Sequence, residues 1–399
     1  MRIHSLTAFE VPVRLKKPVR HASHERHHND TLIIRCELRD GSVGWGEGLP
    51  RTYVTGESID SVWRHLTAAD FASLADNAFD GPLDAVTTLD DFRLPDIPAD
   101  DGVVSRECFG NSVCCALELA VLDAVFRSIG LPLGDLVELL PEGSEMAHRH
   151  EDVRYSGVIT SARPMKQWMS AFKMRLFRFA QVKVKVGAAG INDEVLLKRT
   201  RWAVGEGVDL RLDANEAWRC DEVVAKMQPL LPFNPTCLEQ PVPHAEVAGL
   251  ADVRRELDVP IMLDESLCSR EDAERAIAGT TCDLFNLRLS KCGGFVSCVR
   301  LAALAKQNDL GYQLGCQVGE TGILSAAGRH FACNVSGIRY LEGSFDRFLV
   351  RDSLTTEDMT FRFGGRGTRL DGPGLGITVN EQQVRQLAVR TEELITGAS

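Results

Sequence analysis

The chain has 399 residues, 44% of them hydrophobic and 25% charged, which is typical of a globular enzyme with a sizeable core. Its formal net charge of −11 argues against nucleic acid or an anionic membrane as a partner. No apolar stretch reaches the roughly 18 residues of a membrane span, and the start lacks a secretory signal, so we expect a cytoplasmic protein. None of the 12 cysteines forms a Cys-x-x-Cys pair, and we expect buried, reduced thiols.

The first part of the chain is predicted to form an α+β domain over residues 1–140. Three strand-like runs separated by turns predict an antiparallel meander, at residues 3–11, 31–38 and 42–46. Two segments with helical apolar spacing follow, at residues 56–80 and 104–130. Strands followed by helices in this way are typical of an α+β unit.

From residue 153 the pattern changes to a regular alternation. Eight strand-like runs begin near residues 154, 181, 209, 236, 260, 283, 311 and 338. Helical runs lie between them, at residues 164–179, 193–204, 221–231, 245–257, 270–278, 295–308 and 323–334. This alternation predicts an α/β fold with a parallel barrel over residues 150–345, with an open, doubly wound sheet as the alternative. The final segment, residues 346–399, is expected to pack back on the N-terminal domain.

Two lysines share one face of the predicted strand at residues 181–187. Side chains alternate along a strand, so Lys183 and Lys185 point to one side and the intervening valines to the other. Inside a barrel each ammonium would lower the pKa of the other, which is one way in which a lysine becomes a base near neutral pH. An exposed edge strand with both lysines in water is the alternative.

Three successive predicted strands end in an acid, and each acid is followed by a polar group. The acids are Asp213, Glu239 and Asp264. In a parallel barrel they would lie side by side at the C-terminal rim, where barrel enzymes build their sites. Clustered carboxylates repel one another unless a cation lies among them, and hard oxygen ligands favour Mg²⁺ or Mn²⁺. A helix cap is the alternative explanation for any one of them.

Together these motifs stand in a fixed order along the chain: Lys183-x-Lys185, Asp213-x-Asn215, Glu239-Gln-Pro and Asp264-Glu265-Ser. This order resembles the enolase superfamily, muconate-lactonizing-enzyme subgroup. The resemblance implies a modified TIM barrel, (β/α)₇β, under an α+β capping domain that the C-terminal tail completes. It also implies one Mg²⁺ (or Mn²⁺) per chain and a reaction through an enolate next to a carboxylate.

The resemblance also implies roles for these residues. Lys185 would be the acid/base, and Lys183 would lower its pKa and contact the substrate carboxylate. Asn215 and Glu265 would orient the ligands or the lysines. The segment at residues 20–25, which includes His24, and the segment at residues 46–55 are placed like the family's two substrate-covering loops. His24 also begins a literal His-Glu-x-x-His zinc-protease pattern, but its polar, turn-like flanks do not predict the helix that this pattern needs.

The chain departs from the subgroup at the end of the sixth strand, where most members carry a lysine that faces the acid/base. Arg288 aligns there, and arginine stays protonated, which argues against a two-base epimerisation. Lys291 is expected to point away from that face, with a role as the base instead of Lys185 as the alternative. Glu342 and Ser344 stand where dipeptide epimerases carry Asp-x-Asp, and Glu320 is a further expected pocket group.

These observations predict an enzyme acting on a small-molecule carboxylate. Because Arg288 cannot readily act as a second base, we rank a muconate-cycloisomerase-like reaction first. Dehydration or syn-elimination of an acid sugar or hydroxy acid follows, and then racemisation or epimerisation of an amino acid or dipeptide. A non-catalytic paralogue that binds metal and carboxylate is the alternative from another class. The family's habit also predicts a homo-oligomer.

Overall fold

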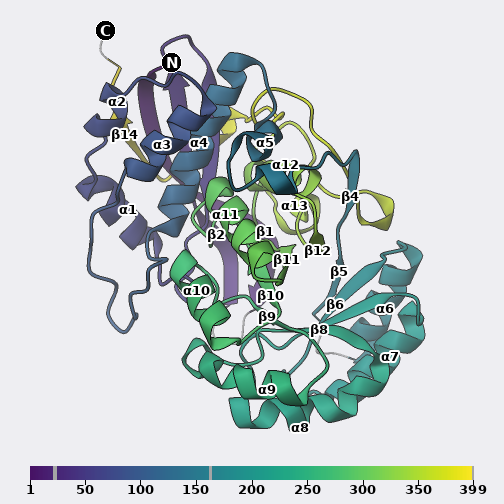
Figure 1. Ribbon diagram of the computed structural model, residues 1–399. Helices are drawn as coiled ribbons and strands as arrows, with labels where there is room; N and C mark the ends of the chain where they lie inside the picture. The colour runs from purple at the N-terminus through teal and green to yellow at the C-terminus, as the bar shows by residue number, and fades with distance from the viewer. Residues whose placement is uncertain (21–24, 161–163, 398–399) are drawn as a thin grey trace.

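An antiparallel sheet forms the N-terminal domain of the computed structural model, which describes residues 1–20, 25–160 and 164–397 (Figure 1). The strand order is β14-β1-β2-β3, with bounds Arg390–Ile395, Ile3–Arg20, Glu25–Leu38 and Val43–Gly48. Strand β14 comes from the end of the chain and pairs antiparallel with β1, for example Glu393 opposite Thr7. The C-terminal tail therefore completes this domain, as predicted.

Strands β1 and β2 are longer than predicted. Their pairing continues beyond residue 11, through Pro12 opposite Asp30 and Arg14 opposite His28. In β1 the buried side chains of Val13 and Leu15 continue the apolar alternation past residue 11, so the prediction ended this strand too early. The added residues of β2, 26–30, are polar and leave no such alternation in the sequence. The predicted lid residue His24 lies outside the described residues.

Five helices accompany the sheet: α1 (Ile59–Ala68), α2 (Ala72–Asp76), α3 (Pro82–Asp91), α4 (Asn111–Ile129) and α5 (Leu136–Leu139). Helix α3 was not predicted, and the predicted segment at 56–80 divides into α1 and α2. Helix α4 lies directly on β3, where Gly44, Gly46 and Gly48 permit the contact. A Cβ atom at Gly46 would lie 1.9 Å from the carbonyl oxygen of Ala116.

Eight parallel strands, β5 to β12, curl into a barrel (Figure 1). Their bounds are Gly157–Ile159, Gln181–Lys185, Asp209–Asp213, Pro235–Glu239, Ile261–Leu263, Leu284–Leu287, Gly311–Leu314 and Ile338–Leu341. The backbone N–H of Ser156 donates to the carbonyl of Leu341 at 2.7 Å, which joins the first strand to the last. The predicted parallel barrel is confirmed, and the open sheet is excluded.

Seven helices connect these strands: α6 (Pro164–Leu176), α7 (Asp193–Val204), α8 (Val223–Met227), α9 (Leu250–Glu256), α10 (Arg270–Gly279), α11 (Phe295–Gln307) and α12 (Gly322–Asn334). The run near Arg154, predicted as the first barrel strand, is instead β4 (Asp152–Arg154), which pairs antiparallel with β13 (Arg366–Thr368). The remaining helices are α13 (Asp346–Leu349) and α14 (Glu381–Leu387). No helix in the described ranges is long and apolar enough to span a membrane.

Two acids of the N-terminal domain attach it to the barrel. Glu47 of β3 accepts hydrogen bonds from the backbone N–H groups of Thr321 and Leu324, at 2.8 and 3.0 Å, where α12 begins. Glu118 of α4 accepts from the N–H groups of Phe295 and Val296 at the start of α11. A carboxylate at a helix N-terminus satisfies unpaired donors and complements the helix dipole. These contacts place the domain over the C-terminal ends of the barrel strands.

Candidate active site

Lys183 lies within a cage of carboxylates inside the barrel. Its Nζ is 3.1 Å from Asp213 Oδ2, 3.3 Å from Glu239 Oε1 and 2.8 Å from Glu342 Oε1. Burial by itself would lower the pKa of Lys183, but these carboxylates outweigh it and hold that pKa well above its usual value. The prediction of a lowered pKa for Lys183 is therefore wrong, because three carboxylates contact its ammonium group.

Lys185 stands at the end of β6, half-buried, with a neutral partner. Its Nζ donates to Oδ1 of Asn215. Asn215 Nδ2 in turn donates to Oε1 of Glu265 at 3.3 Å, and Oε2 of Glu265 is buried without a partner. Lys185, predicted as the base, and Asn215 and Glu265, predicted as its orienting groups, are thus linked by a chain of hydrogen bonds.

Arg288 lies across the barrel mouth from Lys185. It follows β10, and three strands separate β10 from β6 in either direction around the barrel. Its guanidinium Nη2 contacts Oδ2 of Asp264. Burial favours a lower pKa for Arg288, but Asp264 and then Glu265 outweigh it and raise the pKa well above the ordinary value. Arg288 is therefore a fixed cation in this structure.

Lys291 is fully buried behind Asp264. Its Nζ contacts the carbonyl and Oδ1 of Asp264 at 2.7 and 3.0 Å, and it donates to the carbonyl of Asn286 at 2.8 Å. All three protons of the ammonium are used in these contacts. Lys291 thus contacts one oxygen of the Asp264 carboxylate and Arg288 contacts the other, and the full use of its protons argues against Lys291 as the base.

The predicted metal ligands Asp213, Glu239 and Asp264 are buried at the ends of neighbouring strands. Oδ2 of Asp213 is ion-paired with Lys183, and burial raises the pKa of Glu239 to about 7, against the opposing charge of Lys183. Within the described ranges, no group of three or more His, Cys, Asp or Glu side chains is arranged to hold a metal ion. The cations of Lys183 and Arg288 lie among these carboxylates instead. Buried donors that are all carboxylate oxygens fit a hard divalent cation in their chemistry.

The side chains of Glu342 and Ser344 both bind cationic side chains of the same chain. Glu342 contacts Lys183 and the guanidinium of Arg211, a buried residue of β7. Burial would raise the pKa of Glu342, but Lys183 and Arg211 lower it to about 2. Ser344 Oγ accepts from Arg329 Nη2 at 3.0 Å. Sequence reasoning missed Arg211, although it stands two residues before Asp213 and so faces the same interior.

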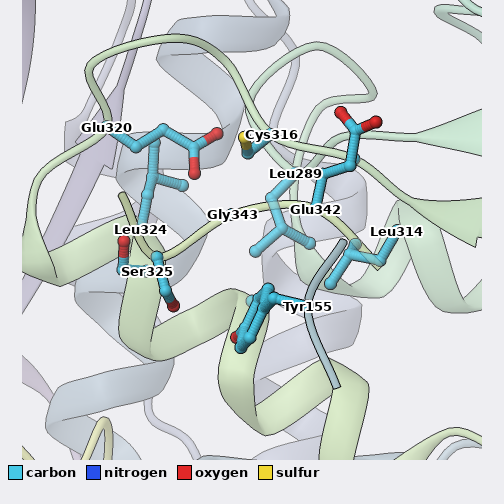
Figure 2. A pocket seen from close by; sticks show the side chains of 12 residues that line it. Tyr155, Leu289, Leu314, Cys316, Glu320, Leu324, Ser325, Glu342 and Gly343 are labelled. Atoms are coloured by element: carbon cyan, nitrogen blue, oxygen red, sulfur yellow. The ribbon is translucent and has the colours of Figure 1, made fainter. Parts of the chain in front are cut away.

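A small cavity lies beside the mouth, at the end of β11 (Figure 2). Its lining includes Glu320, Cys316, Leu289 and Tyr155, and Figure 2 shows the Glu320 carboxyl group directed toward Cys316. Oε1 of Glu320 accepts from the backbone N–H of Gln317 at 2.6 Å, and burial raises the pKa of this acid to about 8. Glu320 is thus a pocket group, mostly neutral at pH 7.

Residues 165–383, which include the barrel strands β6 to β12, match the family described as enolase C-terminal domain-like. The chain belongs to the enolase superfamily. Among its relatives are a D-Ala-D/L-Ala epimerase from Cytophaga hutchinsonii, 28% identical over 316 residues and 79% of each chain, and an N-succinyl-L-Arg/Lys racemase from Bacillus cereus, 25% identical over 393 residues and 98% of each chain.

Solved structures of the enolase superfamily share the fold. The N-succinyl Arg/Lys racemase from Bacillus cereus has a TM-score of 0.84 at 24% identity, covering 98% of this chain and 100% of that chain. A dipeptide epimerase from Cytophaga hutchinsonii, complexed with Mg and D-Ala-L-Val, has a TM-score of 0.82 at 24% identity, covering 99% and 100%.

The relatives bear on the predicted reaction. They support an enzyme of the enolase superfamily and, within it, an isomerase. Their names are those of racemases and epimerases, and they do not support the cycloisomerase reaction that the sequence analysis placed first. That order rested on Arg288 alone, so the racemase or epimerase alternative now has the better support.

Proposed function

We propose that this protein is a Mg²⁺-dependent racemase or epimerase that removes and returns the proton on the α-carbon of an amino-acid derivative with a free carboxylate. The observation that carries this proposal is the placement of Lys185 and Arg288 on opposite sides of a barrel mouth lined by buried acids. The activities named for the relatives support an α-carbon that bears both a carboxylate and a nitrogen.

Lys185 is the group proposed to act on one face of the α-carbon. Within the described part of the chain it forms no ion pair, and its Nζ contacts the neutral amide of Asn215. Lys183, by contrast, is held by three carboxylates. A general base must reach its proton without first breaking an ion pair, so Lys185 is the lysine suited to exchange a proton with substrate.

Arg288 is proposed to act on the opposite face of the α-carbon. Because arginine stays protonated, it stabilises negative charge well but accepts a proton poorly. It can therefore return a proton to a strongly basic carbon more readily than it can remove one. We infer that exchange of the α-proton through Lys185 is faster than inversion of the α-carbon.

The proposed ligands of one Mg²⁺ (or Mn²⁺) are Asp213, Glu239 and Asp264. When bound, a divalent cation offsets the negative charge that develops on a substrate carboxylate as the neighbouring C–H bond breaks. Lys291 holds Asp264 in place, and Asn286 Nδ2 donates to Glu239 Oε1 at 2.9 Å. Such supporting hydrogen bonds orient carboxylate ligands.

The test is hydrogen exchange at the α-carbon. Both enantiomers of N-acylated amino acids and of dipeptides are incubated with the protein and Mg²⁺ in D₂O, and the α-proton signal and the enantiomer ratio are followed by NMR and chiral chromatography. The proposal expects loss of the α-proton in at least one of these substrates, with slower inversion. Retention of the α-proton in every substrate, or unchanged exchange in Lys185→Met, would contradict it.

A one-face elimination is the second candidate. The specific observation in its favour is Arg288, which stands where a second base is expected in the subgroup. In that reaction Lys185 would remove the proton and return it to a leaving group on the same face. Exchange without any inversion, together with loss of water from a β-hydroxy acid, would identify it. Substrate binding with no exchange would indicate the non-catalytic paralogue.

A further inference from the structure

Helices α6 and α7 expose large apolar side chains on the outer side of the barrel, away from helices α1 to α3 (Figure 1). Residues of these types are usually buried in a folded protein. The exposed ones are Met165 (72% exposed), Met169 (54%), Phe172 (41%) and Leu176 (71%) on α6, and Trp202 (66%) on α7. These five residues are called the α6–α7 patch below. Single exposed hydrophobic residues are ordinary, whereas a contiguous group marks an interaction surface.

The patch is continuous across the two helices. The ring of Trp168, on α6, lies 5.9 Å from that of Phe172 and 5.1 Å from that of Trp202, measured between centroids. The rings of Phe172 and Trp202 are 5.8 Å apart. Along α6 the patch residues recur at intervals of four, three and four positions, so they share one face of the helix. Gln167 and Ala171, on the opposite face, are buried.

The area of the patch can be compared with what a stable interface needs. A fully exposed side chain of this size presents roughly 200 Å², so the observed fractions leave about 600 Å² of the five residues accessible. A standard interface buries about 800 Å² on each partner, of which roughly 60% is apolar. The patch by itself therefore supplies the apolar part of one side of such an interface.

The shape of the patch fits a copy of itself. Apolar residues at intervals of four and three are the spacing with which helices pack against one another. A two-fold axis brings the same surface of both copies together, so one patch is enough for a closed dimer. The α6 and α7 helices of two copies would then form one layer of four helices. Trp202, at the edge of the ring cluster, is of the residue type that most often dominates the binding energy of an interface.

The charges of the two helices distinguish a second copy from other partners. The exposed charged residues are mostly basic: Lys166, Lys173 and Arg175 on α6 and Lys198 on α7, against Glu194 on α7. Two such borders repel each other weakly, and salt screens that repulsion. A dimer held by the apolar patch should therefore tighten as salt rises. Binding to an anionic surface should weaken instead, and the net charge of −11 opposes it over the rest of the chain.

We propose that the α6–α7 patch binds the same patch of a second copy of this chain in a two-fold symmetric dimer. The inference names a surface, whereas the resemblance in the sequence implied only that the chain associates. It does not depend on the proposed reaction, since association is measured without substrate. Helix α6 leads into β6, which carries Lys183 and Lys185, and α7 leads into β7, which carries Asp213. The dimer would thus brace the outer side of the strands that carry these residues.

The experiment measures the mass of the full chain by sedimentation velocity and light scattering over a range of concentrations. We expect the wild type to associate, and Trp202→Glu and Met169→Glu each to raise the dissociation constant about 100-fold or more, because each places a charge in the apolar contact of both copies. If the wild type forms a larger assembly, these variants should reduce its mass to half or less. Val389→Glu is the matched control, because Val389 is 66% exposed like Trp202 and lies outside the patch.

Salt titration of the wild type supplies a test that needs no variant. We expect the dissociation constant to fall by about threefold or more between low and high NaCl concentrations. Circular dichroism shows whether the variants keep the fold. A wild type that stays monomeric at about 100 µM, or an association that both patch variants leave unchanged, overturns the inference. Association that weakens with salt also overturns it, as does a monomer that binds phosphatidylglycerol vesicles through Trp202 and Met169.

Discussion

Replacing Glu47 by glutamine tests whether a buried acid joins the N-terminal domain to the barrel. Besides the N–H groups of α12, Glu47 accepts from Thr321 Oγ1 at 2.7 Å, and the residue is fully buried. Burial raises the pKa of Glu47 from its ordinary 4.5 to about 7, although hydrogen bonds from Leu324 and Thr321 oppose this. Glutamine has the same shape as the neutral acid and does not titrate.

The sign of the effect follows from proton binding. Between pH 4.5 and 7 the folded protein holds the proton on Glu47 and the unfolded chain releases it, so folding takes up a proton in this window. The contribution of Glu47 to stability is therefore fully present below pH 4.5 and is lost as the pH rises through 7. From these two pKa values the loss between pH 5 and pH 8 is about 2.5 kcal/mol.

The assay is urea unfolding of wild type and Glu47→Gln at several pH values from 5 to 8. We expect the free energy of unfolding of wild type minus that of the variant to decrease by about 2.5 kcal/mol over this range. Glu274→Gln, an exposed acid in an i,i+4 pair with Arg270, is the control and should show no such trend. A difference that stays constant, or that grows with pH, would refute the burial argument.

Three further results are expected. Lys185→Met should slow α-proton exchange by about 100-fold or more, because general acid/base catalysis is lost; a retained rate, with the fold checked by circular dichroism, would refute that role. Chelation of divalent cations with EDTA should abolish exchange, and Mg²⁺ should restore it and raise Tm; exchange that survives chelation would contradict the proposed ligands. Lys291→Met should lower the free energy of unfolding by about 3–5 kcal/mol, because it leaves the buried Asp264 without one of its cations; a urea-unfolding loss below about 1 kcal/mol would contradict this.

Local patterns in the sequence were sufficient to predict the barrel. Strands and helices each have their own side-chain period, so the alternation from residue 181 to residue 341 predicted seven of the eight strands near their observed positions. Local pattern misplaced the strand predicted near Arg154. The short run there has the pattern of a barrel strand, but in the fold it pairs with β13. The unpredicted length of β2 follows from its polar residues 26–30, which leave no hydrophobic signal, whereas β1 does continue its apolar alternation through Val13 and Leu15.

By itself the sequence determined the order of lysines and acids along the strands, since their spacing reflects one strand and one helix at a time. Only the tertiary structure decided how these groups are paired. Lys183 and Glu342 are 159 residues apart, and they meet only because the barrel brings their strands to one interior. The same closure gives Lys183 a raised pKa in place of the lowered one expected from Lys185 alone. The raised pKa of Glu47 likewise depends on the docking of two domains, because burial is a property of the assembled surfaces rather than of any local segment.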